Sequence, residues 1–495
     1  MNKYVRNTYK HILKPLLTTV TVLVTLLLLV VLYGGFNVLV WTQSDNQVHL
    51  DYKQSYLRQL ATRTPLENPP NIVFILYDDL GYGDIGPGST DQIATPHIDQ
   101  LAANGVSLSQ FYSPASACTP SRAGYLSARL APRAGLPAVV FTPHHPMNYF
   151  AKAFGNRNLR LPAEEILIPE VLAAVGYRTG MVGKWNLGDH SPSLPNDFGF
   201  QQFFGGLYAN DMKPFALYRD GEIEVEAPVD QSQLNNSYTR EATQFIKSGG
   251  DQPFFLYLAH TSPHIPLSVH SDQVGRSRAG LYGDVVEDLD DGIGSIVRAL
   301  EETGQLDNTL IIISSDNGPW FQGSIGGLRG RKGDTFEGGM RVPFIAHWPA
   351  RLPRGVVRDQ ISMGIDLLPT IADWLGLPLP TDRIIDGLSV AQMLESGSPG
   401  PHEYLHYYAG EELLAVRDQR FKYRPRYGIA YGAANMPIWV GIPRGPWLFN
   451  LADDMSESFD VSTVYGADMT RLSNEFERKK NEMTVNKRGW LPTGN

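Results

Sequence analysis

The sequence predicts an α/β protein whose central sheet is mostly parallel and is covered by helices on both faces. Three observations lead to this prediction. Short apolar runs, such as 71–76, recur along the chain and are typical of parallel strands buried on both faces. Helical stretches lie between these runs, and strands that alternate with helices form parallel sheets. A composition of 42% hydrophobic and 19% charged residues among 495 supplies a large core.

The N-terminus predicts a membrane anchor. Residues 1–15 contain four Lys or Arg side chains, whereas residues 16–36 contain no charge and are mostly Leu and Val. Twenty-one helical residues at ~1.5 Å each extend over roughly 30 Å, the thickness of the hydrocarbon core of a bilayer. Since the basic residues precede the apolar run, residues 1–15 are expected to stay in the cytoplasm.

A cleaved signal peptide is the alternative. It requires a shorter apolar core, of about 7–15 residues, and a small-residue cleavage site. The run here is longer, and it ends in residues 33–37, Tyr-Gly-Gly-Phe-Asn, which form a poor site. We therefore expect residues 16–40 to remain as a transmembrane signal anchor, with the rest of the chain exported. A single cysteine cannot form a disulfide within the chain, and together these features predict a bacterial inner-membrane protein that faces the periplasm.

Beyond the anchor, the sequence predicts a linker, a main domain and a smaller subdomain. Residues 41–70 are polar and end in two prolines, which is typical of a linker. The main domain is expected at 71–400, with strands at 71–76, 180–182, 254–258 and 310–314, and with helices at 169–175 and 281–302 and between Thr95 and Gly105. The C-terminal subdomain at 401–495 is expected to be α+β, with antiparallel strands at 413–417 and 421–423 and a helix at 468–487.

Cys118, the single cysteine, is followed at fixed offsets by Pro120, Ser121 and Arg122. Ser121 is expected to cap a short helix that runs to about Ala128. Cys118 would then lie at the entry of a helix, where backbone N–H groups and the helix dipole favour an anion, and Arg122 adds a positive charge. A buried structural cysteine is the alternative. The surroundings favour an anion pocket with a nucleophile at its mouth.

Two polar pairs follow predicted strands and indicate a metal site. Asp78 and Asp79 stand after the first strand, and Asp316 and Asn317 follow a later one. Ligand sites of parallel sheets concentrate at the carboxyl ends of strands. Three carboxylates and an amide oxygen suit Ca²⁺ or Mg²⁺ better than zinc. The alternative is that these acidic residues are ordinary solvated turn residues.

Several segments resemble, in the same order, the family of formylglycine-dependent sulfatases, which are arylsulfatase A-like members of the alkaline phosphatase superfamily. Residues 118–122 are similar to its signature C-x-P-S-R, in which the cysteine is oxidised enzymatically to formylglycine. The resemblance runs from about residue 71 to 460. The other matching segments are 78–79 (D-D), 176–188 (G-Y-x-T…G-K-W-H-L-G), 253–266 (ending in P-H-x-P), 316–318 (D-N-G), 328–339 (K-G-x-x-F-E-G-G) and 447–457 (N-L-x-x-D).

The resemblance implies the roles of the site residues. Cys118, as formylglycine, and Arg122 belong to the catalytic set together with Lys184, His264 and Lys332, which also bind the sulfate. Lys184 would clamp the sulfate, Lys332 would neutralise it, and His264 would protonate the leaving group. The implied metal is Ca²⁺, with Mg²⁺ as the alternative, and its ligands are Asp78, Asp79, Cys118, Asp316 and Asn317.

Asn186 departs from the family pattern, which has a histidine at this position. That histidine is thought to take the proton whose removal expels sulfate. An amide can bind the substrate or the nucleophile by hydrogen bonds, but it cannot accept that proton. Asn186 is therefore expected in the substrate-binding set, and His190 is the first substitute base to consider.

The implied function is hydrolysis of a sulfate ester on a sulfated small molecule or carbohydrate, after maturation by a formylglycine-generating enzyme. A phosphonate or phosphodiester hydrolase of the same superfamily is the alternative, and a non-catalytic protein that binds sulfate esters is a second one. Nucleic acid is not an expected partner, since the net charge is −9 and there is no basic run. Residues expected at the substrate rim are Tyr112, His144, His145, Tyr208 and Trp320.

Overall fold

The computed structural model describes residues 14–64, 67–86, 89, 92–154, 158–425 and 445–493. The chain divides into two compact units, which are described separately. The first comprises Met1–Ser44 and Phe141–Leu159, and the second comprises Asp45–Val140 and Arg160–Asn495.

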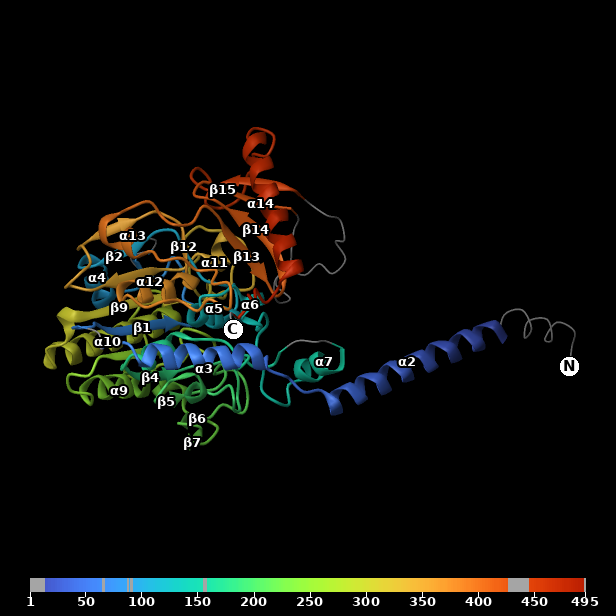
Figure 1. Ribbon diagram of the computed structural model, residues 1–495, viewed down its shortest axis with the longest axis horizontal. Coiled ribbons are helices and arrows are strands. Elements are labelled where there is room, and N and C mark those ends of the chain that lie inside the picture. The colour runs from blue at the N-terminus through green and yellow to red at the C-terminus, as the bar shows by residue number, and fades with distance from the viewer. Residues whose placement is uncertain are drawn as a thin grey trace, which may run out of the picture. The chain divides into compact units, whose positions relative to one another are not determined.

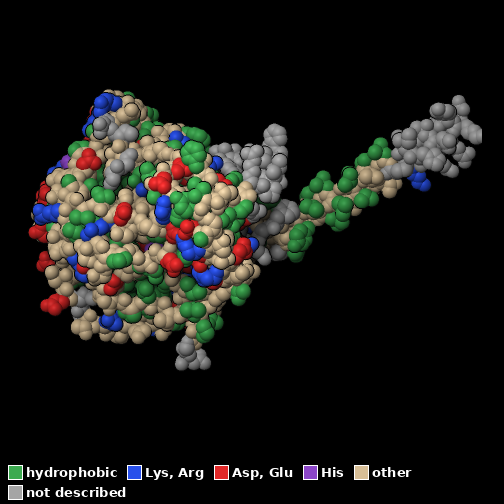
Figure 2. Space-filling view, turned by 90° about the horizontal axis from the view of Figure 1, so that it is seen from above, with side chains coloured by type: hydrophobic (Ala, Val, Ile, Leu, Met, Phe, Trp, Pro, Cys, Tyr) green, Lys and Arg blue, Asp and Glu red, His purple; other side chains and the backbone are tan. Residues whose placement is uncertain are grey.

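Among its described residues, the first unit contains two helices, α2 (Lys14–Val40) and α7 (Pro146–Phe154), which pack against each other. Apolar side chains cover α2 along its length (green in Figure 2). Its stretch Leu16–Val38 is long and apolar enough to cross a membrane, a property that a signal sequence shares. The predicted apolar helix is thus confirmed as a helix, and its retention as an anchor remains a prediction.

The core of the second unit is a ten-stranded, mostly parallel sheet (Figure 1). Strand β1 (Asn71–Tyr77) lies between β8 (Phe254–Ala259) and β9 (Thr309–Ser315) and runs parallel to both. Strand β4 (Arg178–Gly183) continues the parallel region beyond β8. All four predicted strands of the main domain are therefore confirmed, and they are neighbours in the sheet.

The remaining strands extend the sheet at both edges. Its order is β11-β2-β10-β9-β1-β8-β4-β5-β6-β7, with β10, β6 and β7 antiparallel to their neighbours. The bounds are β2 (Val106–Leu108), β5 (Gln202–Gly205), β6 (Leu217–Arg219), β7 (Glu222–Val225), β10 (Phe344–His347) and β11 (Val356–Arg358), and a separate parallel pair is formed by β3 (Phe111–Tyr112) and β12 (Ser362–Met363).

Helices cover both faces of the sheet, as predicted, because successive side chains of a strand point to opposite faces. Phe74 of β1 belongs to a core cluster with side chains of α3, α5, α8, α12 and α13, and Ile75 belongs to a second cluster with α4, α9 and α10. The bounds are α3 (Gln47–Ala61), α4 (Pro96–Ala103), α5 (Cys118–Ser127), α6 (Ala131–Ala134), α8 (Ile168–Ala174), α9 (Leu234–Lys247), α10 (Gly280–Glu302), α11 (Glu337–Met340), α12 (Leu367–Trp374) and α13 (Ala391–Ser396).

The predicted linker is wrong for residues 47–61, which form α3. Its buried residues are His49, Lys53, Tyr56 and Leu60, at the helical spacing of four, three and four. Because two of these four residues are polar, the sequence does not show the apolar periodicity of an amphipathic helix here. Both are satisfied by distant partners: His49 Nδ1 lies 2.7 Å from Asp382 Oδ2, and Lys53 Nζ lies 2.6 Å from Glu170 Oε1.

Ser121 does not cap α5. The helix begins at Cys118, with Ala117 at the N-cap position, and Ser121 lies inside the first turn and is fully buried. Pro120 fits there because the first residues of a helix have N–H groups with no partner inside the helix, so its missing N–H costs nothing. Cys118 is therefore the first helical residue rather than a loop residue.

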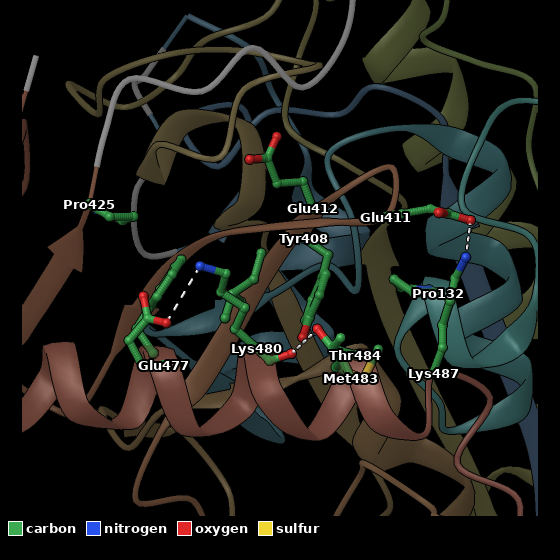
Figure 3. A pocket seen from close by; sticks show the side chains of 12 residues that line it. Pro132, Tyr408, Glu411, Glu412, Pro425, Glu477, Lys480, Met483, Thr484 and Lys487 are labelled. Carbon is green, nitrogen blue, oxygen red and sulfur yellow. Dashed lines mark hydrogen bonds and ion pairs between the residues drawn. The ribbon is translucent and has the colours of Figure 1, made fainter. Parts of the chain in front are cut away.

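The C-terminal subdomain is confirmed as α+β (orange and red in Figure 1). Its antiparallel sheet has the order β13 (Leu405–Ala409), β14 (Glu412–Arg417), β15 (Phe421–Arg424) and β16 (Trp447–Asn450), and α14 (Gly466–Val485) packs on β14 and β15. A cavity of about 770 Å³ lies between α14 and the β13–β14 hairpin (Figure 3). None of the predicted site residues lines it.

A buried ionic cluster joins this subdomain to α11 and β3 of the main domain. Glu337 of α11 accepts hydrogen bonds from Tyr112 (2.6 Å) and from Lys422 of β15 (3.0 Å), and Lys422 also pairs with Glu457 at 3.0 Å. All four residues are fully buried. Tyr112 is expected at the substrate rim from the sequence, but it is a core residue. Its partner Glu337 lies far along the sequence, so the local pattern does not reveal this contact.

Replacing Lys422 by methionine should lower the free energy of unfolding by about 3–5 kcal/mol. Glu457 would lose the ammonium that lies 3.0 Å away, and Glu337 would keep only the more distant guanidinium groups of Arg417 and Arg341, at 3.7 and 3.8 Å. The matched control is Lys480→Met, since Lys480 forms an exposed pair with Glu477 at 3.4 Å and such substitutions usually stay within about 0.5 kcal/mol. Denaturant unfolding of the full chain in detergent measures both. Equal effects of the two substitutions would contradict the prediction.

Candidate active site

The predicted site residues meet at one edge of the sheet. Asp78 follows β1, Lys184 follows β4, His264 lies beyond β8, and Asp316 follows β9. Because these strands are parallel neighbours, their carboxyl ends lie at the same edge, where ligand sites of such sheets concentrate. Residues up to 253 positions apart in the sequence are thereby brought into hydrogen-bonding distance.

Cys118 is placed at this edge by the start of α5. Its Sγ lies 3.2 Å from Asp78 Oδ1, and its side chain is buried. Burial, together with the carboxylates of Asp316 and Asp78, raises the pKa of the Cys118 thiol. The ammonium groups of Lys184 and Lys332 lower this pKa by less than burial and the carboxylates raise it, so the thiol stays protonated at neutral pH, and a protonated thiol is a poor nucleophile.

The residues around Cys118 fit a hard metal ion. Asp78, Asp79, Cys118 and His264 each offer one ligand atom, and these four atoms lie within 4.8 Å of one another. Asn317 donates its Nδ2 to Asp79 Oδ1 at 2.7 Å, whereas its Oδ1 is buried and has no hydrogen-bond donor among the described residues. A buried acceptor without a partner costs free energy, and a cation would satisfy it.

Three cations balance the three carboxylates. Lys184 Nζ lies 2.5 Å from Asp78 Oδ2, Lys332 Nζ lies 2.7 Å from Asp79 Oδ1, and Arg122 Nη2 lies 2.8 Å from Asp316 Oδ2.

The cations also shift the titration of these groups. Burial opposes ionisation of Asp78, but Lys184, His264 and Arg122 outweigh it and hold the pKa of Asp78 well below its usual range. Burial lowers the pKa of Lys184, but Asp78, Cys118 and Asp316 together raise it by more, so the net shift is upward. Both side chains are therefore ionised at neutral pH.

Arg122 also fixes the backbone of the site. Its Nη1 donates to the carbonyl oxygen of Lys184 at 2.8 Å, and its Nε donates to Asp316 Oδ2 at 2.9 Å. The side chain is fully buried. It therefore holds α5, the end of β4 and the end of β9 in one arrangement.

His264 presents one ring nitrogen to the site. Its Nδ1 lies 2.6 Å from the carbonyl oxygen of Ile265, so Nδ1 carries a proton and donates it. The other nitrogen, Nε2, lies 3.8 Å from Asp79 Oδ2, and the side chain is 9% exposed. Nε2 is thus the atom that can exchange a proton with a bound molecule.

Asn186 bonds to Thr119, the residue after Cys118, and its amide is occupied by protein contacts. Its Oδ1 accepts from Thr119 Oγ1 at 2.9 Å, and its Nδ2 donates to the carbonyl oxygen of Val140 at 3.2 Å. The N–H of Val140 donates to Thr119 Oγ1 at 3.1 Å, which closes a ring of three residues. The ring ties the first turn of α5 to Val140, an arrangement that favours a positioning role for Asn186.

His190 lies outside the buried site. Its side chain is 66% exposed, and its Nδ1 lies 2.6 Å from Asp189 Oδ1. Tyr208 donates its hydroxyl to the other oxygen of Asp189. Among the described residues, no hydrogen bond or ion pair links His190 to the Cys118 cluster, so the substitute base is not identified by contact.

Sequence reasoning missed Thr119, Val140 and the structural role of His260. Thr119 occupies the variable position of the C-x-P-S-R signature, which gave no reason to single it out. The ring of His260 lies 5.3 Å from that of Tyr77 and 6.2 Å from that of Tyr238. Burial, aided by Arg122, lowers the pKa of His260 to about 3, so it is a neutral core residue.

The other residues expected at the rim are only partly accounted for. Tyr208 is buried, and Trp320 is half-buried. Trp320 follows Pro319, whose carbonyl oxygen accepts from the N–H of Lys332 at 3.0 Å, so it lies close to the site in the second unit. His144 and His145 belong to the first unit, and their roles at the rim remain predictions.

Comparisons with known proteins agree with this arrangement. The family model described as Sulfatase matches residues 70–377. The chain is 37% identical over 393 residues to N-acetylgalactosamine-6-sulfatase of Mus musculus, a match that covers 74% of each chain. It is 36% identical over 406 residues to arylsulfatase A of Homo sapiens, covering 74% of this chain and 77% of the relative.

Solved structures show the same fold. The crystal structure of Ps i-CgsB in complex with k-i-k-neocarrahexaose has a TM-score of 0.72 and 28% identity, and the match covers 86% of this chain and 95% of that one. A phosphonate monoester hydrolase from Silicibacter pomeroyi has a TM-score of 0.59 over 83% of this chain and 95% of its own. At 20% identity this second likeness shows the fold alone.

The family model covers more than half of the chain, and the two relatives align with most of it. The segment that the family model matches contains Cys118, the four acidic and amide residues expected to bind the metal, and all four residues expected to bind sulfate. The chain therefore belongs to the sulfatase family and is a sulfuric ester hydrolase.

Proposed function

We propose that the enzyme cleaves its sulfate ester with a formylglycine made from Cys118 and with a divalent cation. The observation that carries this proposal is the position of Cys118 at the first residue of α5, with Sγ 3.2 Å from Asp78 and with His264 and Asp79 in the same group of ligand atoms. A thiol with a raised pKa is a poor nucleophile there, whereas an aldehyde hydrate offers a hydroxyl that a cation can acidify.

The proposed cation is Ca²⁺, with Mg²⁺ as the alternative. Its ligands would be Asp78, Asp79, Asp316, Asn317 and residue 118, an oxygen-rich set once the sulfur has been replaced. The buried Oδ1 of Asn317, which lacks a donor among the residues described, supports its place in this set. When bound, the cation supplies Lewis-acid stabilisation of a sulfate oxygen.

The charges of the site support a sulfate monoester as the substrate. The three cations and three carboxylates cancel, so a divalent ion would leave two positive charges. A sulfate monoester carries one negative charge, and an ionised nucleophile carries a second. The filled site is then neutral when His264 is neutral and carries one positive charge when His264 is an imidazolium. Its fixed positive groups stabilise the charge that develops during sulfuryl transfer.

Each polar side chain has a proposed task in this scheme. Lys184 and Lys332 oppose the sulfate oxygens, and Arg122 holds Asp316 and the backbone of Lys184 in place. His264 keeps its Nδ1 proton on the carbonyl oxygen of Ile265. As an imidazolium it would therefore donate the Nε2 proton to the leaving oxygen.

Because position 186 holds an asparagine, sulfate release should be the slow step. Rapid mixing with an aryl sulfate should show a burst of the phenol, close to one equivalent per site, before a slower steady state. A general base typically contributes ~10²–10⁴-fold. Asn186→His should therefore remove the burst and raise the steady-state rate.

The control is Asn186→Ala, which removes the bonds to Thr119 and Val140 without adding a base. It should slow both phases and keep the burst. An enzyme that shows no burst, together with an Asn186→His variant that is no faster, would mean that another group takes the proton, with His190 the first to replace.

The proposed substrates are sulfated carbohydrates. The names of two similar proteins support this class, since one is an N-acetylgalactosamine-6-sulfatase and the other was solved with a carrageenan-type oligosaccharide, k-i-k-neocarrahexaose. Turnover should be measured on sulfated mono- and oligosaccharides, aryl sulfates and aryl phosphonates. Faster turnover of the phosphonates would favour the phosphonate hydrolase alternative, and binding without turnover would favour the non-catalytic one.

We further propose that α2 anchors the enzyme in a membrane and that the rest of the chain lies on the exported side. The length and apolar character of Leu16–Val38 support this proposal, as do the basic residues that precede it. A bacterial inner membrane facing the periplasm is the proposed setting, and a formylglycine-generating enzyme is the proposed partner that matures Cys118.

A further inference from the structure

Three polar side chains meet beyond the carboxyl ends of β4 and β5. Asp189 and His190 follow β4, and Tyr208 follows β5. Asp189 Oδ1 lies 2.6 Å from His190 Nδ1, and Asp189 Oδ2 accepts the hydroxyl of Tyr208 at 2.5 Å. The Asp189 side chain is 21% exposed and that of His190 is 66% exposed, whereas Tyr208 is buried. A buried tyrosine therefore holds a carboxylate that a dissolved molecule can still reach.

The backbone connects this group to the residues expected to bind sulfate. The N–H of Asn186 donates to the carbonyl oxygen of Leu207 at 3.2 Å, just beyond the ends of the two strands. Lys184 lies two residues before Asn186, and Asp189 lies three residues after it. Tyr208 directly follows Leu207. Because β4 borders β8 and β8 borders β1, the group lies at the same edge of the sheet as the active site.

The loop that carries Asp189 and His190 is held in one conformation. The N–H of Ser193 donates to the carbonyl oxygen of His190 at 2.9 Å, and the carbonyl oxygen of Ser193 accepts from Trp185 Nε1 at 2.8 Å. A side chain at Gly188 would meet Cβ of Ser193 at 2.7 Å, so the chain passes too closely for any residue but glycine. Because the loop is ordered before a ligand arrives, binding costs it little conformational entropy.

Asp189 and His190 keep hydrogen-bonding capacity for a ligand. In the described part of the chain, the hydrogen bonds and ion pairs of the Asp189 carboxylate go to His190 and Tyr208, whereas a carboxylate offers about four acceptor sites. Burial and the Asp189 carboxylate raise the pKa of Tyr208, so its hydroxyl stays protonated and donates. Since His190 Nδ1 faces Asp189, Nε2 of the exposed ring remains for a bound molecule.

We propose that Asp189 and His190 bind hydroxyl groups of the sugar that carries the sulfate. This inference rests on the proposed carbohydrate substrate and assigns its recognition to named residues. Sugar hydroxyls both donate and accept, so they match a carboxylate beside an imidazole. Asp189 would repel a second sulfate or a carboxylate at the same place, so the part of the ring that reaches it is uncharged. Asp189 and His190 thus determine specificity, and Tyr208 is a positioning residue.

Steady-state kinetics with two kinds of substrate test this proposal on the full chain in detergent. One substrate is para-nitrophenyl sulfate, which has no sugar hydroxyls. The other is the hexose or N-acetylhexosamine monosulfate that the native enzyme turns over fastest. Asp189→Ala and His190→Ala should each lower the ratio of kcat/KM for the sugar to kcat/KM for the aryl sulfate by about 10–10²-fold, the size expected for a lost hydrogen bond to a charged group. The loss should appear mainly in the KM of the sugar.

The matched control is Asp373→Ala, which should leave this ratio unchanged. Asp373 is an exposed acid that accepts a hydroxyl, from Ser389 Oγ at 2.6 Å. It lies at the end of α12, where the ring of Trp374 contacts that of Trp348 with centroids 5.4 Å apart. Trp348 Nε1 donates to Asn308, the residue before β9. Asp373 is therefore near the amino ends of the strands, away from the active site.

Sugar monosulfates that lack one hydroxyl test the contact itself. The native enzyme should lose about tenfold or more on at least one such analogue. Asp189→Ala or His190→Ala should lose no further activity on that analogue, because a contact already removed cannot be removed again. Losses that simply add in enzyme and substrate would contradict the contact.

The outcomes separate this inference from the proposals on which it rests. A variant that loses the same factor on both substrates would overturn the inference, because the group would then serve the fold or the chemistry, as a base role of His190 requires. The proposed sulfate hydrolysis would still stand. If the native enzyme turns over the aryl sulfate but none of the sugars, the proposed carbohydrate class fails, and the inference fails with it.

Discussion

Replacing Cys118 by alanine is expected to abolish turnover of any sulfate ester, with a loss on the order of 10⁶-fold, the size seen when a covalent nucleophile is removed from a hydrolase. The physical reason is that the surrounding groups only stabilise charge, so none of them can replace the atom that attacks sulfur. Lys184, Lys332 and Arg122 should still hold the sulfate, because each is paired with a carboxylate that remains. Binding of substrate should therefore survive while turnover is lost.

The best-matched control for this prediction is the native chain whose residue 118 has not been converted to formylglycine. The native chain made without a formylglycine-generating enzyme differs only in the functional group of residue 118, and it should be as inactive as Cys118→Ala. Mass spectrometry of the peptide that contains residue 118 should show the aldehyde or its hydrate in active preparations. Activity in preparations whose residue 118 is entirely a thiol would rule out the proposed nucleophile.

Removing the charge of Asp316 is expected to release the divalent cation and to lower turnover at least ~10³-fold. A metal ion stabilises the transition state by several kcal/mol, and each 1.36 kcal/mol is tenfold in rate. Asp316→Asn is preferred to alanine, because its amide oxygen still accepts from the buried Arg122, while the bond from the N–H of Asp79 is lost. Metal content by elemental analysis and steady-state rates measure the two effects.

Two further variants make the metal result specific. Asn317→Ala removes a ligand without leaving a buried charge, and it should lower the affinity for the cation while the fold remains. Asp84→Asn is the matched control: Asp84 is a buried acid in the same loop region, but it bonds to Tyr282 and to the N–H groups of Gly81 and Ser324. Asp84→Asn should retain one equivalent of metal. Full activity of the metal-free enzyme would contradict the metal site itself.

The four central strands could be predicted because each is a continuous apolar run that must be buried on both faces. Four site residues could be placed together because they directly follow two of these apolar runs, and the carboxyl ends of parallel strands lie at one edge of a sheet. These residues are Asp78, Asp79, Asp316 and Asn317. The predicted N-cap of α5, Ser121, lies four residues after the observed one, Ala117. A serine is a good cap in isolation, and a buried first turn is not visible in the sequence pattern.

The sequence alone determined the family and the apolar N-terminal helix, and it singled out the proposed nucleophile and ligand set, because each depends on residue types at short, fixed spacings. Tertiary structure decided what depends on partners far along the chain. It made α3 a packed helix through Asp382 and Glu170, moved Tyr112 from the rim into a buried cluster with Glu337 and Lys422, and occupied the amide of Asn186 with Thr119 and Val140. In each case a buried polar side chain bonds to a group far along the sequence, which no local pattern reveals. Burying the side chain without that partner would cost free energy, and this cost favours the observed arrangement.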